Sequence, residues 1–446
     1  MSNAFSGYVG SWLCDENGVF DPVPTVSFDF PVLLKGTIPG LTLTWSTIYG
    51  EWASEFRITA YNGDKSVFAK IFTNDGIIAL VEADIRGYTK LTIEVLQWSK
   101  PYRRARMEGV VFGIQKVYRK SDIMSYNATM YVNPLSAELP KSEITFEIKN
   151  LNGEFNPDNP QGAEKYIMER QRVTVSYGYK LGDMVEWIPG GIFYLSEWET
   201  PQNGITATLK ARDAFELMTD LYTGPICGTL YQIAKAALVQ ANLPSLPNGY
   251  SCWFLHPYLE RVVVPEDAEL RDCSIAEVLQ YVANAGCCVL YQNRRGQVRI
   301  EPLLRNLTDY SIDRFNSYAD SELVLTKPLK AVAVNRDRYI LPVARNGTTQ
   351  PIENPLISDK QAPAVAEWAA ELLANRRTLS GAFRVDPRLD PLDIVTNVNQ
   401  FSASRVVVSE VKFSYNGAFR GSYRGRGVDQ LFGKYFHVGE LYTGEV

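Results

Sequence analysis

Residues 143–217 constrain the fold of this chain most, because short alternating segments follow one another there at close intervals. In the first segment every second residue from Ile144 to Ile148 is apolar, which is the period of a half-buried strand. The run Asn-Pro-Asp-Asn-Pro then ends the segment, since proline cannot donate a hydrogen bond to a neighbouring strand. The same alternation returns at 173–177, 193–195 and 205–209. Strands at this spacing predict a small β-barrel or sandwich.

The composition indicates a large globular protein that is rich in β-structure. With 446 residues the chain is too long for one ordinary core, and we expect three or four domains. Hydrophobic residues at 46% and charged residues at 21% argue against a disordered chain, and 12% aromatic residues favour strands. The net charge of −5 argues against a non-specific nucleic-acid binder, so no specific nucleic-acid partner is expected.

The sequence leads us to expect neither a membrane-spanning segment nor a metal site. The first residues show no signal-peptide pattern, and no stretch approaches the roughly 18 apolar residues of a spanning helix. We therefore expect a protein that is made in a cytoplasm. The six cysteines show no CxxC spacing, and His256 and His437 are the only histidines. We expect reduced structural thiols, no metal and no cofactor.

Residues 1–118 are expected to form one β domain. Alternating segments flank Asn62-Gly63, which predicts a hairpin with a type I′ turn, because that turn requires positive φ values. Further alternation at 91–95 and 110–114 adds two strands. The run WSKPYRRARMEGVVFGI, which begins at Trp98, resembles the discoidin-like jelly rolls that are inserted near the start of many phage tail-tip proteins.

Three amphipathic helices are expected in the second half of the chain. Apolar residues recur at helical spacing at 230–241 and at 273–283, where Ser274 with a glutamate three residues later predicts a capped start. A hairpin is expected at 288–300. A third helix is expected at 362–377, between segments that show strand periodicity.

These segments resemble, in wording and domain order, the hub proteins at the tail tip or baseplate of long-tailed bacteriophages. The block 143–217 resembles the first hub barrel, GQVRIEP at 296–302 resembles the small domain that follows it, and the last segment resembles the second hub barrel. The resemblance implies a mainly β fold with α+β parts, in which an N-terminal jelly roll precedes two hub-type β-barrels separated by a small α+β domain. The implied domains are 1–118 (discoidin-like jelly-roll β-sandwich), 119–220 (first hub β-barrel), 221–318 (small α+β domain) and 319–446 (second hub β-barrel with an inserted helix and a C-terminal arm).

The same resemblance implies a structural virion protein and not an enzyme. Hub proteins form a ring at the end of the tail channel, with the barrels of three subunits side by side. The implied partners are further copies of the chain in a homotrimer, the tail-tube or distal tail protein, the tape measure protein, and a fibre or spike. We therefore expect the chain in the virion, where it would join the tail tube to host-recognition components. The alternative is a carbohydrate-binding host adhesin that acts through the N-terminal jelly roll on a host surface glycan.

Motifs for catalysis, nucleotide binding and calcium binding are missing from the sequence. It has no GxSxG, HExxH or GxxxxGK[ST] pattern, and His256 lies in an aromatic loop where packing is the simpler interpretation. Oxygen-bearing side chains recur at every second position from Asn150 to Asp158. However, Phe155 and Gln161 occupy the places where an EF-hand needs a glycine and an acid, so a polar turn is the simpler interpretation. Carboxylate pairs suited to glycoside hydrolysis arise in any chain with 50 acidic residues and are uninformative.

A group of aromatic and arginine residues in the first domain suits sugar binding, because sugars offer apolar faces and hydrogen-bonding hydroxyls. Trp45 and Trp98 lie on or beside alternating segments and are expected in the core. Tyr49 and Trp52 lie in a glycine-containing loop and are expected to be exposed. The candidate glycan-binding residues are Tyr49, Trp52, Arg103 and Arg104.

The run 416–427 mixes three arginines and two aromatic residues with four glycines. We expect it to be flexible alone, because glycine-rich backbone loses much entropy when it becomes ordered. We expect it to order against an adjacent subunit, where its arginines would pair with acidic groups. Contact with nucleic acid or an anionic glycan is the alternative. The candidate interface residues are Phe419, Arg420, Tyr423, Arg424 and Arg426.

Overall fold

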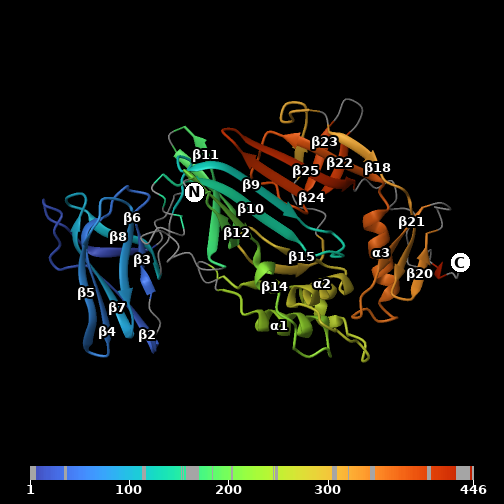
Figure 1. The fold of residues 1–446 in the computed structure, drawn as a ribbon, viewed down its shortest axis with the longest axis horizontal. Helices are drawn as coiled ribbons and strands as arrows, with labels where there is room; N and C mark the ends of the chain where they lie inside the picture. The colour runs from blue at the N-terminus through green and yellow to red at the C-terminus, as the bar shows by residue number, and fades with distance from the viewer. Residues whose placement is uncertain are drawn as a thin grey trace. The chain divides into compact units, whose positions relative to one another are not determined.

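The structure is a computed structural model in which the chain divides into two compact units, 1–118 and 119–446 (Figure 1). The dividing point coincides with the end that the sequence suggested for the first domain. The described residues are 7–34, 38–112, 117–151, 153, 155–156, 170–182, 184–201, 204–244, 246, 250–303, 309–319, 321–341, 347–398, 403–427 and 442–443.

The first unit is a sandwich of two four-stranded antiparallel sheets, with strand orders β1-β8-β3-β6 and β2-β7-β4-β5. Its strands are β1 (Tyr8–Leu13), β2 (Thr25–Leu34), β3 (Ile38–Trp45), β4 (Ala53–Asn62), β5 (Lys65–Thr73), β6 (Ile78–Ile85), β7 (Tyr88–Trp98) and β8 (Arg104–Phe112). Alternate residues of both sheets fill one core, in which Trp45, Phe56 and Leu91 are fully covered. The prediction that Trp45 and Trp98 lie in the core is confirmed. A jelly-roll or discoidin-like assignment of this sandwich remains a prediction.

The predicted hairpin at Asn62-Gly63 is present, but the predicted turn type is wrong. Asn62 pairs with Lys65 across a two-residue turn, and Gly63 is the only residue of that turn with a positive φ, at 59°. A type I′ turn requires positive φ at both central residues, whereas a type II′ turn requires it only at the first. The turn therefore has the φ pattern of type II′.

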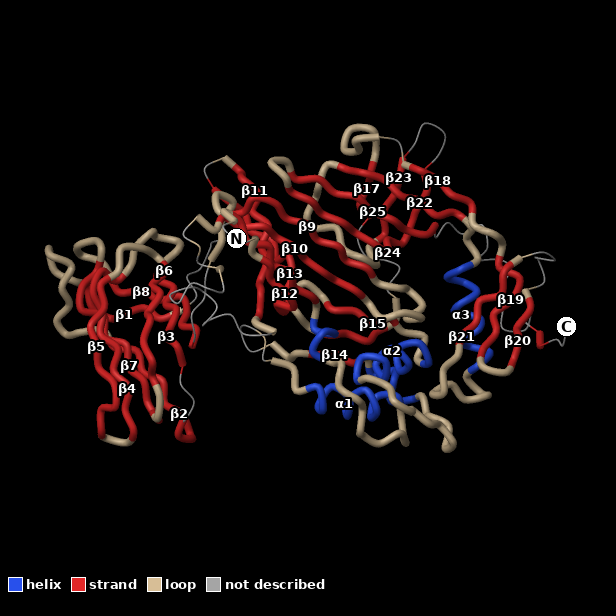
Figure 2. Tube along the Cα trace, in the orientation of Figure 1, coloured by secondary structure: helices blue, strands red, loops and turns tan. Residues whose placement is uncertain are grey.

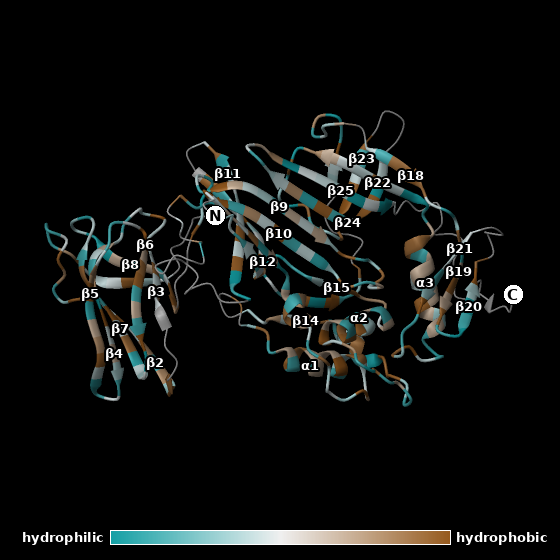
Figure 3. Ribbon diagram, viewed as in Figure 1, coloured by the Kyte–Doolittle hydropathy of each residue, from teal (hydrophilic) through white to brown (hydrophobic). Residues whose placement is uncertain are grey.

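The second unit is built around one eleven-stranded sheet, in which nine strands follow the order β11-β12-β13-β10-β9-β24-β25-β22-β18 (Figures 1 and 2). Its strands are β9 (Ile123–Tyr131), β10 (Lys141–Lys149), β11 (Arg172–Leu181), β12 (Met184–Glu199), β13 (Thr206–Arg212), β17 (Asp309–Ile312), β18 (Glu322–Leu325), β22 (Arg377–Phe383), β23 (Ile394–Val398), β24 (Ala403–Tyr415) and β25 (Phe419–Gly427). Hydrophobic and hydrophilic residues alternate along several of these strands (Figure 3). The strands of 119–220 and of 319–427 thus share one sheet, joined where β9 pairs with β24.

Strand β24 changes its partner on one side halfway along its length. Ala403–Val407 pair with β23, whereas Glu410–Tyr415 pair with β9, and β25 pairs on the other side from Val406 to Tyr415. The register shifts between Val408 and Glu410, and the Ser409 carbonyl accepts a hydrogen bond from the backbone N–H of Val132. A bulge of this kind bends a strand, and here it marks the point at which β24 leaves one partner for the next.

Helices pack on two smaller sheets in the same unit (Figure 2). The elements are α1 (Leu230–Ala241), α2 (Ile275–Ala285), β14 (Trp253–Leu255), β15 (Val289–Gln292), β16 (Val298–Glu301), β19 (Leu329–Val334), β20 (Asp337–Ile340), β21 (Thr348–Ile352), α3 (Ala362–Leu373) and β26 (Tyr442–Thr443). The capping box at Ser274 and Glu277 is confirmed, as is the hairpin of β15 and β16. One hydrophobic core joins all three helices to residues of β12, β15, β16 and β19.

The third predicted helix extends too far at its C-terminal end. Helix α3 ends at Leu373, and Arg377 already begins β22, which pairs with β25. The Asn375 side chain accepts a hydrogen bond from the Arg377 backbone N–H, so the turn between them supplies its own partner. Local helical periodicity could not reveal this pairing with a strand more than 40 residues away.

The structure confirms a mainly β fold with small α+β parts. The second unit shares one core, with buried members from Leu135 to Ala370, and one large sheet, and the domain boundaries near 220 and 318 remain predictions. Assignment of these parts to two hub barrels remains a prediction. None of the helices in the described part of the chain combines the length and apolar character that crossing a membrane requires.

Candidate functional site

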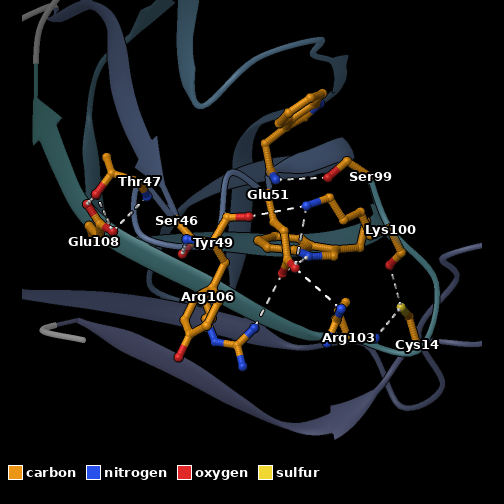
Figure 4. Close-up of polar contacts among 12 residues, drawn as sticks. Cys14, Ser46, Thr47, Tyr49, Glu51, Ser99, Lys100, Arg103, Arg106 and Glu108 are labelled. Carbon is orange, nitrogen blue, oxygen red and sulfur yellow. Dashed lines mark hydrogen bonds and ion pairs between the residues drawn. The ribbon is translucent and has the colours of Figure 1, made fainter. Parts of the chain in front are cut away.

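A tight loop in the first unit holds the main candidate site (Figure 4). Ser46 and Glu51 exchange two backbone hydrogen bonds, which close a four-residue turn between β3 and β4. Gly50, with φ of 59°, occupies the left-handed position that this turn requires. The Glu108 carboxylate accepts hydrogen bonds from the backbone N–H and the hydroxyl of Thr47, at 2.7 and 2.8 Å. The loop is therefore fixed at its start and at its close.

Glu51 is a buried carboxylate surrounded by basic side chains, and we call these residues the Glu51 cluster (Glu51, Trp98, Lys100, Arg103 and Arg106). The Glu51 side chain is only 3% exposed. Its Oε2 accepts hydrogen bonds from Trp98 Nε1 at 3.2 Å and from Arg106 Nη1 at 3.3 Å. Its Oε1 lies 3.3 Å from Arg103 Nε and 3.9 Å from Lys100 Nζ. One carboxylate thus faces three cations.

The cations of the Glu51 cluster differ in how far they are available to solvent. The Arg106 side chain is 19% exposed, and its guanidinium stacks 4.3 Å from the ring centre of Tyr49. Arg103 is 57% exposed and Lys100 is 47% exposed. Within the described part of the chain, Nη1 and Nη2 of Arg103 have no hydrogen-bond partner. The cluster therefore presents a guanidinium fork and an ammonium group to solvent.

An exposed tyrosine in a strained backbone conformation lies beside the cluster. Tyr102, the residue before Arg103, has φ of 55° and is 62% exposed. A bulky side chain in the left-handed region is uncommon and costs about 1–2 kcal/mol. Hydrogen bonds of the next residue hold this backbone in place. The Cys14 N–H donates to the Arg103 carbonyl, and the Arg103 N–H donates to Cys14 Sγ.

The structure brings two of the four predicted glycan-binding residues, Tyr49 and Arg103, together at the Glu51 cluster. Tyr49 is 50% exposed, as expected. Trp52 is half-buried and packs against the core, which corrects the expectation that it is exposed; its backbone N–H is bonded to Ser99 Oγ. Arg103 belongs to the Glu51 cluster, whereas Arg104 lies exposed opposite Leu13 and does not contact Glu51. Glycan binding itself remains a prediction.

The sequence did not indicate Glu51, the residue that organises this site. A single glutamate after Tyr-Gly shows no pattern, and its burial depends on Trp98 and on β8, which lie about 50 residues further along the chain. Arg106 stands in the same basic run as Arg103, but only the strand register shows which arginines share a partner.

The arginine-glycine run does not form a flexible arm, and this expectation is wrong. Residues Phe419–Gly427 form strand β25, which pairs with β24 on one side and β22 on the other. Its glycines lie against packed neighbours. A Cβ at Gly425 would stand 2.5 Å from the carbonyl oxygen of Val407, and one at Gly421 would stand 2.7 Å from the ring of Phe383. The glycines therefore permit close packing of an ordered strand.

Strand alternation divides the five candidate interface residues of β25. Tyr423 is buried inside the chain, where its hydroxyl bonds Ser321 and Asn397, so it cannot contact another subunit. Phe419 packs against Tyr177 and Phe413. Arg426 donates to the Leu373 carbonyl at 3.1 Å. Arg420 and Arg424 are exposed, whereas Phe419 and Arg426 are half-buried, and an interface role for the run remains a prediction.

Arg294, in the turn between β15 and β16, holds three parts of the second unit together. Its Nε bonds Asp390 Oδ1 at 2.6 Å, and its Nη2 bonds the Leu389 carbonyl at 2.9 Å. Its Nη1 donates to the carbonyls of Pro189, in β12, and Pro387. Arg294 is 14% exposed, and every nitrogen of its guanidinium has a partner. The residue therefore acts as a structural latch.

The large sheet is branched and ends in three terminal strands, β11, β18 and β17, two of which lie where apolar side chains are exposed. Among the described residues, β18 pairs only with β22, β11 only with β12 and β17 only with β23. On β18 the exposed residues are Leu323 (49%), Val324 (48%) and Leu325 (61%). At the other end, the hairpin of β11 and β12 exposes Tyr179 (60%), Leu181 (51%), Val185 (46%) and Trp187 (65%).

The remaining expectations concern isolated polar groups. His256 caps a short 3-10 helix, its Nδ1 accepting from the Tyr258 backbone N–H, so it has a structural role. All six cysteines are free. Asn150 is buried, and its side-chain oxygen accepts from the Phe155 N–H; the rest of the calcium-like pattern falls largely outside the described residues. Among the described residues no group of three or more potential ligands could hold a metal ion.

No protein-family model matches the chain, and no curated protein matches it. Among solved structures, the chain is similar to the tail protein from Neisseria meningitidis MC58, with a TM-score of 0.46 and 12% identity over 70% of this chain and 93% of that one. It is similar to the 43 kDa tail protein of prophage MuSo2 from Shewanella oneidensis, with a TM-score of 0.46 and 11% identity over 71% and 94%. A third similar structure, a prophage tail protein from Listeria monocytogenes EGD-e, has a TM-score of 0.43 and 11% identity over 68% and 89%.

Proposed function

We propose that this chain is a structural protein of a bacteriophage tail, a hub that forms a ring at the tail tip or baseplate. The ring would be a homotrimer at the end of the tail channel. It would connect the tail tube to the components that recognise the host. The observation that carries the proposal is the eleven-stranded sheet, in which the edges at β11 and β18 both expose apolar residues.

Open sheet edges require cover, because unpaired backbone groups and apolar side chains together invite pairing with another chain. The two apolar edges of this sheet lie at different strands, β18 and β11, so a contact between them would be head-to-tail. Such contacts build a closed ring when the rotation between copies closes. A ring of three copies would cover both edges of each subunit, and this supports the scaffold role that the sequence resemblance implies.

The proposal is tested by the oligomeric state of the full chain. We expect trimers in native mass spectrometry, and monomers when Val324 and Leu325 on β18 are both replaced by lysine. Since both side chains are exposed, the melting temperature of the monomeric variant should stay close to that of the wild type.

The matched control places the same two charges on another edge strand. Val67 and Ile71 lie on β5, the last strand of a sheet in the first unit, and are 42% and 46% exposed. Their replacement by lysine should leave the trimer intact. A wild-type chain that stays monomeric, together with an electron-microscopy map of intact tails that lacks three-fold symmetry at this protein, would refute the proposal.

A further inference from the structure

We propose that the Glu51 cluster is a binding site for an anionic glycan, a sugar polymer that carries carboxylate or phosphate groups. This inference concerns the first unit and goes beyond the scaffold role, which depends on the second unit. It is carried by the surplus of cations around one buried carboxylate, together with the aromatic side chains beside them (Figure 4).

The charge balance of the cluster favours an anion. Three cations, Lys100, Arg103 and Arg106, face the single charge of Glu51, which leaves a surplus of two positive charges (3 − 1 = 2). Two further acids, Glu108 and Asp15, keep their negative charges but are bonded to neutral groups. The Glu108 carboxylate is bonded to Thr47, and the Asp15 carboxylate accepts from the backbone N–H groups of residues 17 and 19. Within the described residues neither of these acids forms an ion pair with the three cations, so the cluster itself keeps its surplus and exposes Lys100 and Arg103 to an added anion.

Glu51 acts as a positioning residue for these cations. Because its carboxylate is buried and bonded to Trp98 and Arg106, its position is fixed by the core. Arg103 lies against Glu51 through Nε, and within the described residues its two terminal nitrogens have no hydrogen-bond partner, so their N–H groups are available to a ligand. A planar guanidinium fork matches the paired oxygens of a carboxylate or a phosphate.

The aromatic groups favour a sugar over a simple anion. Tyr49 is half-exposed, with the Arg106 guanidinium held over its ring. Tyr102 keeps its ring 62% exposed at the cost of a left-handed backbone, and strain of this kind concentrates at ligand-binding positions. Exposed tyrosine rings next to charged donors offer the apolar face of a sugar ring a surface to lie on. An extended nucleic-acid strand would call for a longer basic stripe, and the chain carries a net charge of −5.

The experiment uses the full chain and four immobilised polymers: poly(glycerol phosphate), polygalacturonate, neutral dextran and an oligothymidylate. We expect binding to one or both anionic glycans, weakening with salt, and none to dextran. The Arg103→Gln variant should bind about tenfold more weakly, since it loses one charge-assisted contact. The Arg86→Gln variant is the matched control, because Arg86 precedes β7 whereas the cluster lies at the far end of that strand; its binding should equal that of the wild type.

A second variant separates binding from folding. Tyr102→Gly relieves the left-handed strain, so we expect its melting temperature to rise by about 2–4 °C while its glycan affinity falls. A merely structural tyrosine would lose stability when truncated, or would leave binding unchanged. The inference is overturned if the wild type binds neither anionic glycan, if Arg103→Gln binds as the wild type does, or if the oligothymidylate binds as tightly as the glycans. If the wild type binds, its preference for the phosphate polymer or the uronate polymer shows which anionic group the site recognises. The trimer can form in either case, so failure here is distinguishable from failure of the scaffold role.

Discussion

Arg103 in the first unit and Arg294 in the second unit are both paired with a carboxylate, yet their surroundings give them opposite roles. Arg103 is 57% exposed and uses one nitrogen on a buried acid that two other cations also contact. Arg294 is 14% exposed and uses all three nitrogens, on Asp390 and on three backbone carbonyls. The first has two terminal nitrogens left for a ligand, whereas every nitrogen of the second donates within the chain.

The comparison teaches that the burial of the two partners decides what an ion pair does. At the Glu51 cluster the acid is buried and the bases are exposed, so the fold holds the acid and offers the bases to solvent. At the latch the arginine is covered, and Asp390 keeps 37% of its side chain exposed beside a cavity of about 210 Å³. Replacing a covered arginine therefore leaves acceptors in several segments without their hydrogen-bond donor, whereas replacing an exposed arginine leaves the fold intact.

The largest expected effect follows from this difference and concerns Arg294. Arg294→Met keeps the apolar stem but removes the charge and all donors, and we expect the second unit to lose about 3 kcal/mol of unfolding free energy. Arg103→Met is the matched change in the first unit and should cost under about 0.5 kcal/mol. Denaturant unfolding of both variants checks the pair. Equal losses would show that exposure does not separate the two arginines.

The pH dependence of the Arg294→Met deficit sharpens the same comparison. Burial raises the pKa of Asp390 to about 6, while Arg294 acts to lower it. A carboxyl whose folded pKa is raised favours the folded state at low pH, and this contribution is lost as pH rises through the folded pKa. Without Arg294 the pKa of Asp390 rises further, so the variant keeps its proton to a higher pH than the wild type. We therefore expect the deficit to shrink as pH falls from about 8 to about 5, measured as the difference in melting temperature.

In the Arg294→Met/Asp390→Asn double variant the carboxylate charge at position 390 is absent at every pH. The single variant should regain melting temperature relative to the wild type at low pH, because Asp390 becomes protonated. The double variant has no Asp390, so its difference from the wild type should not shrink in this way. A single-variant deficit that stays constant between these pH values would mean that Asp390 does not titrate in this range.

A third arginine-rich segment, β25, is expected to show an intermediate effect through its glycines. Gly425→Ala would place a Cβ 2.5 Å from the Val407 carbonyl oxygen, and backbone cannot retreat as a side chain can. We expect a loss of about 1–3 kcal/mol. Gly109→Ala in β8 is the control, because a Cβ there meets no atom within 4 Å, and we expect no loss. Thermal unfolding of both variants checks this. If Gly425→Ala is as stable as the wild type, β25 is loosely packed at this position.

Local patterns predicted the elements well where one segment determines its own structure. Helix α1 has the predicted bounds, the capping box at Ser274 is present, and the strand from Ile144 to Ile148 lies within β10. Each of these depends on residues within a few positions of one another. The turn at Gly63 failed in detail, because Asn-Gly permits two turn types and the flanking strands select one.

Features that depend on distant segments could not be predicted from periodicity. The glycines of β25 indicated flexibility in the sequence, but their neighbours Val407 and Phe383 come from other strands. Similarly, Tyr49 and Arg103 were foreseen as candidates, whereas Glu51 became visible only when β8 and the turn after β3 came together. A residue type shows what a side chain can do, and its partner decides what it does.

The smallest expected effect on folding concerns the two exposed arginines of β25, and it separates local from intermolecular roles. Arg426 is bonded to the Leu373 carbonyl and burial lowers its pKa, so Arg426→Ala should lose about 1 kcal/mol. Arg420 and Arg424 lie on the same face of the strand but are exposed, and Arg420→Ala/Arg424→Ala should change stability by less than about 0.5 kcal/mol. If these two arginines pair with acids of a neighbouring subunit, the double variant should nevertheless assemble tails poorly, while Arg426→Ala with its lower melting temperature assembles more normally. Unimpaired assembly of the double variant would confine β25 to a role within its own chain, as with Arg294. Impaired assembly would show that β25 contacts another subunit through exposed arginines, just as Arg103 has donors available for a molecule outside the chain.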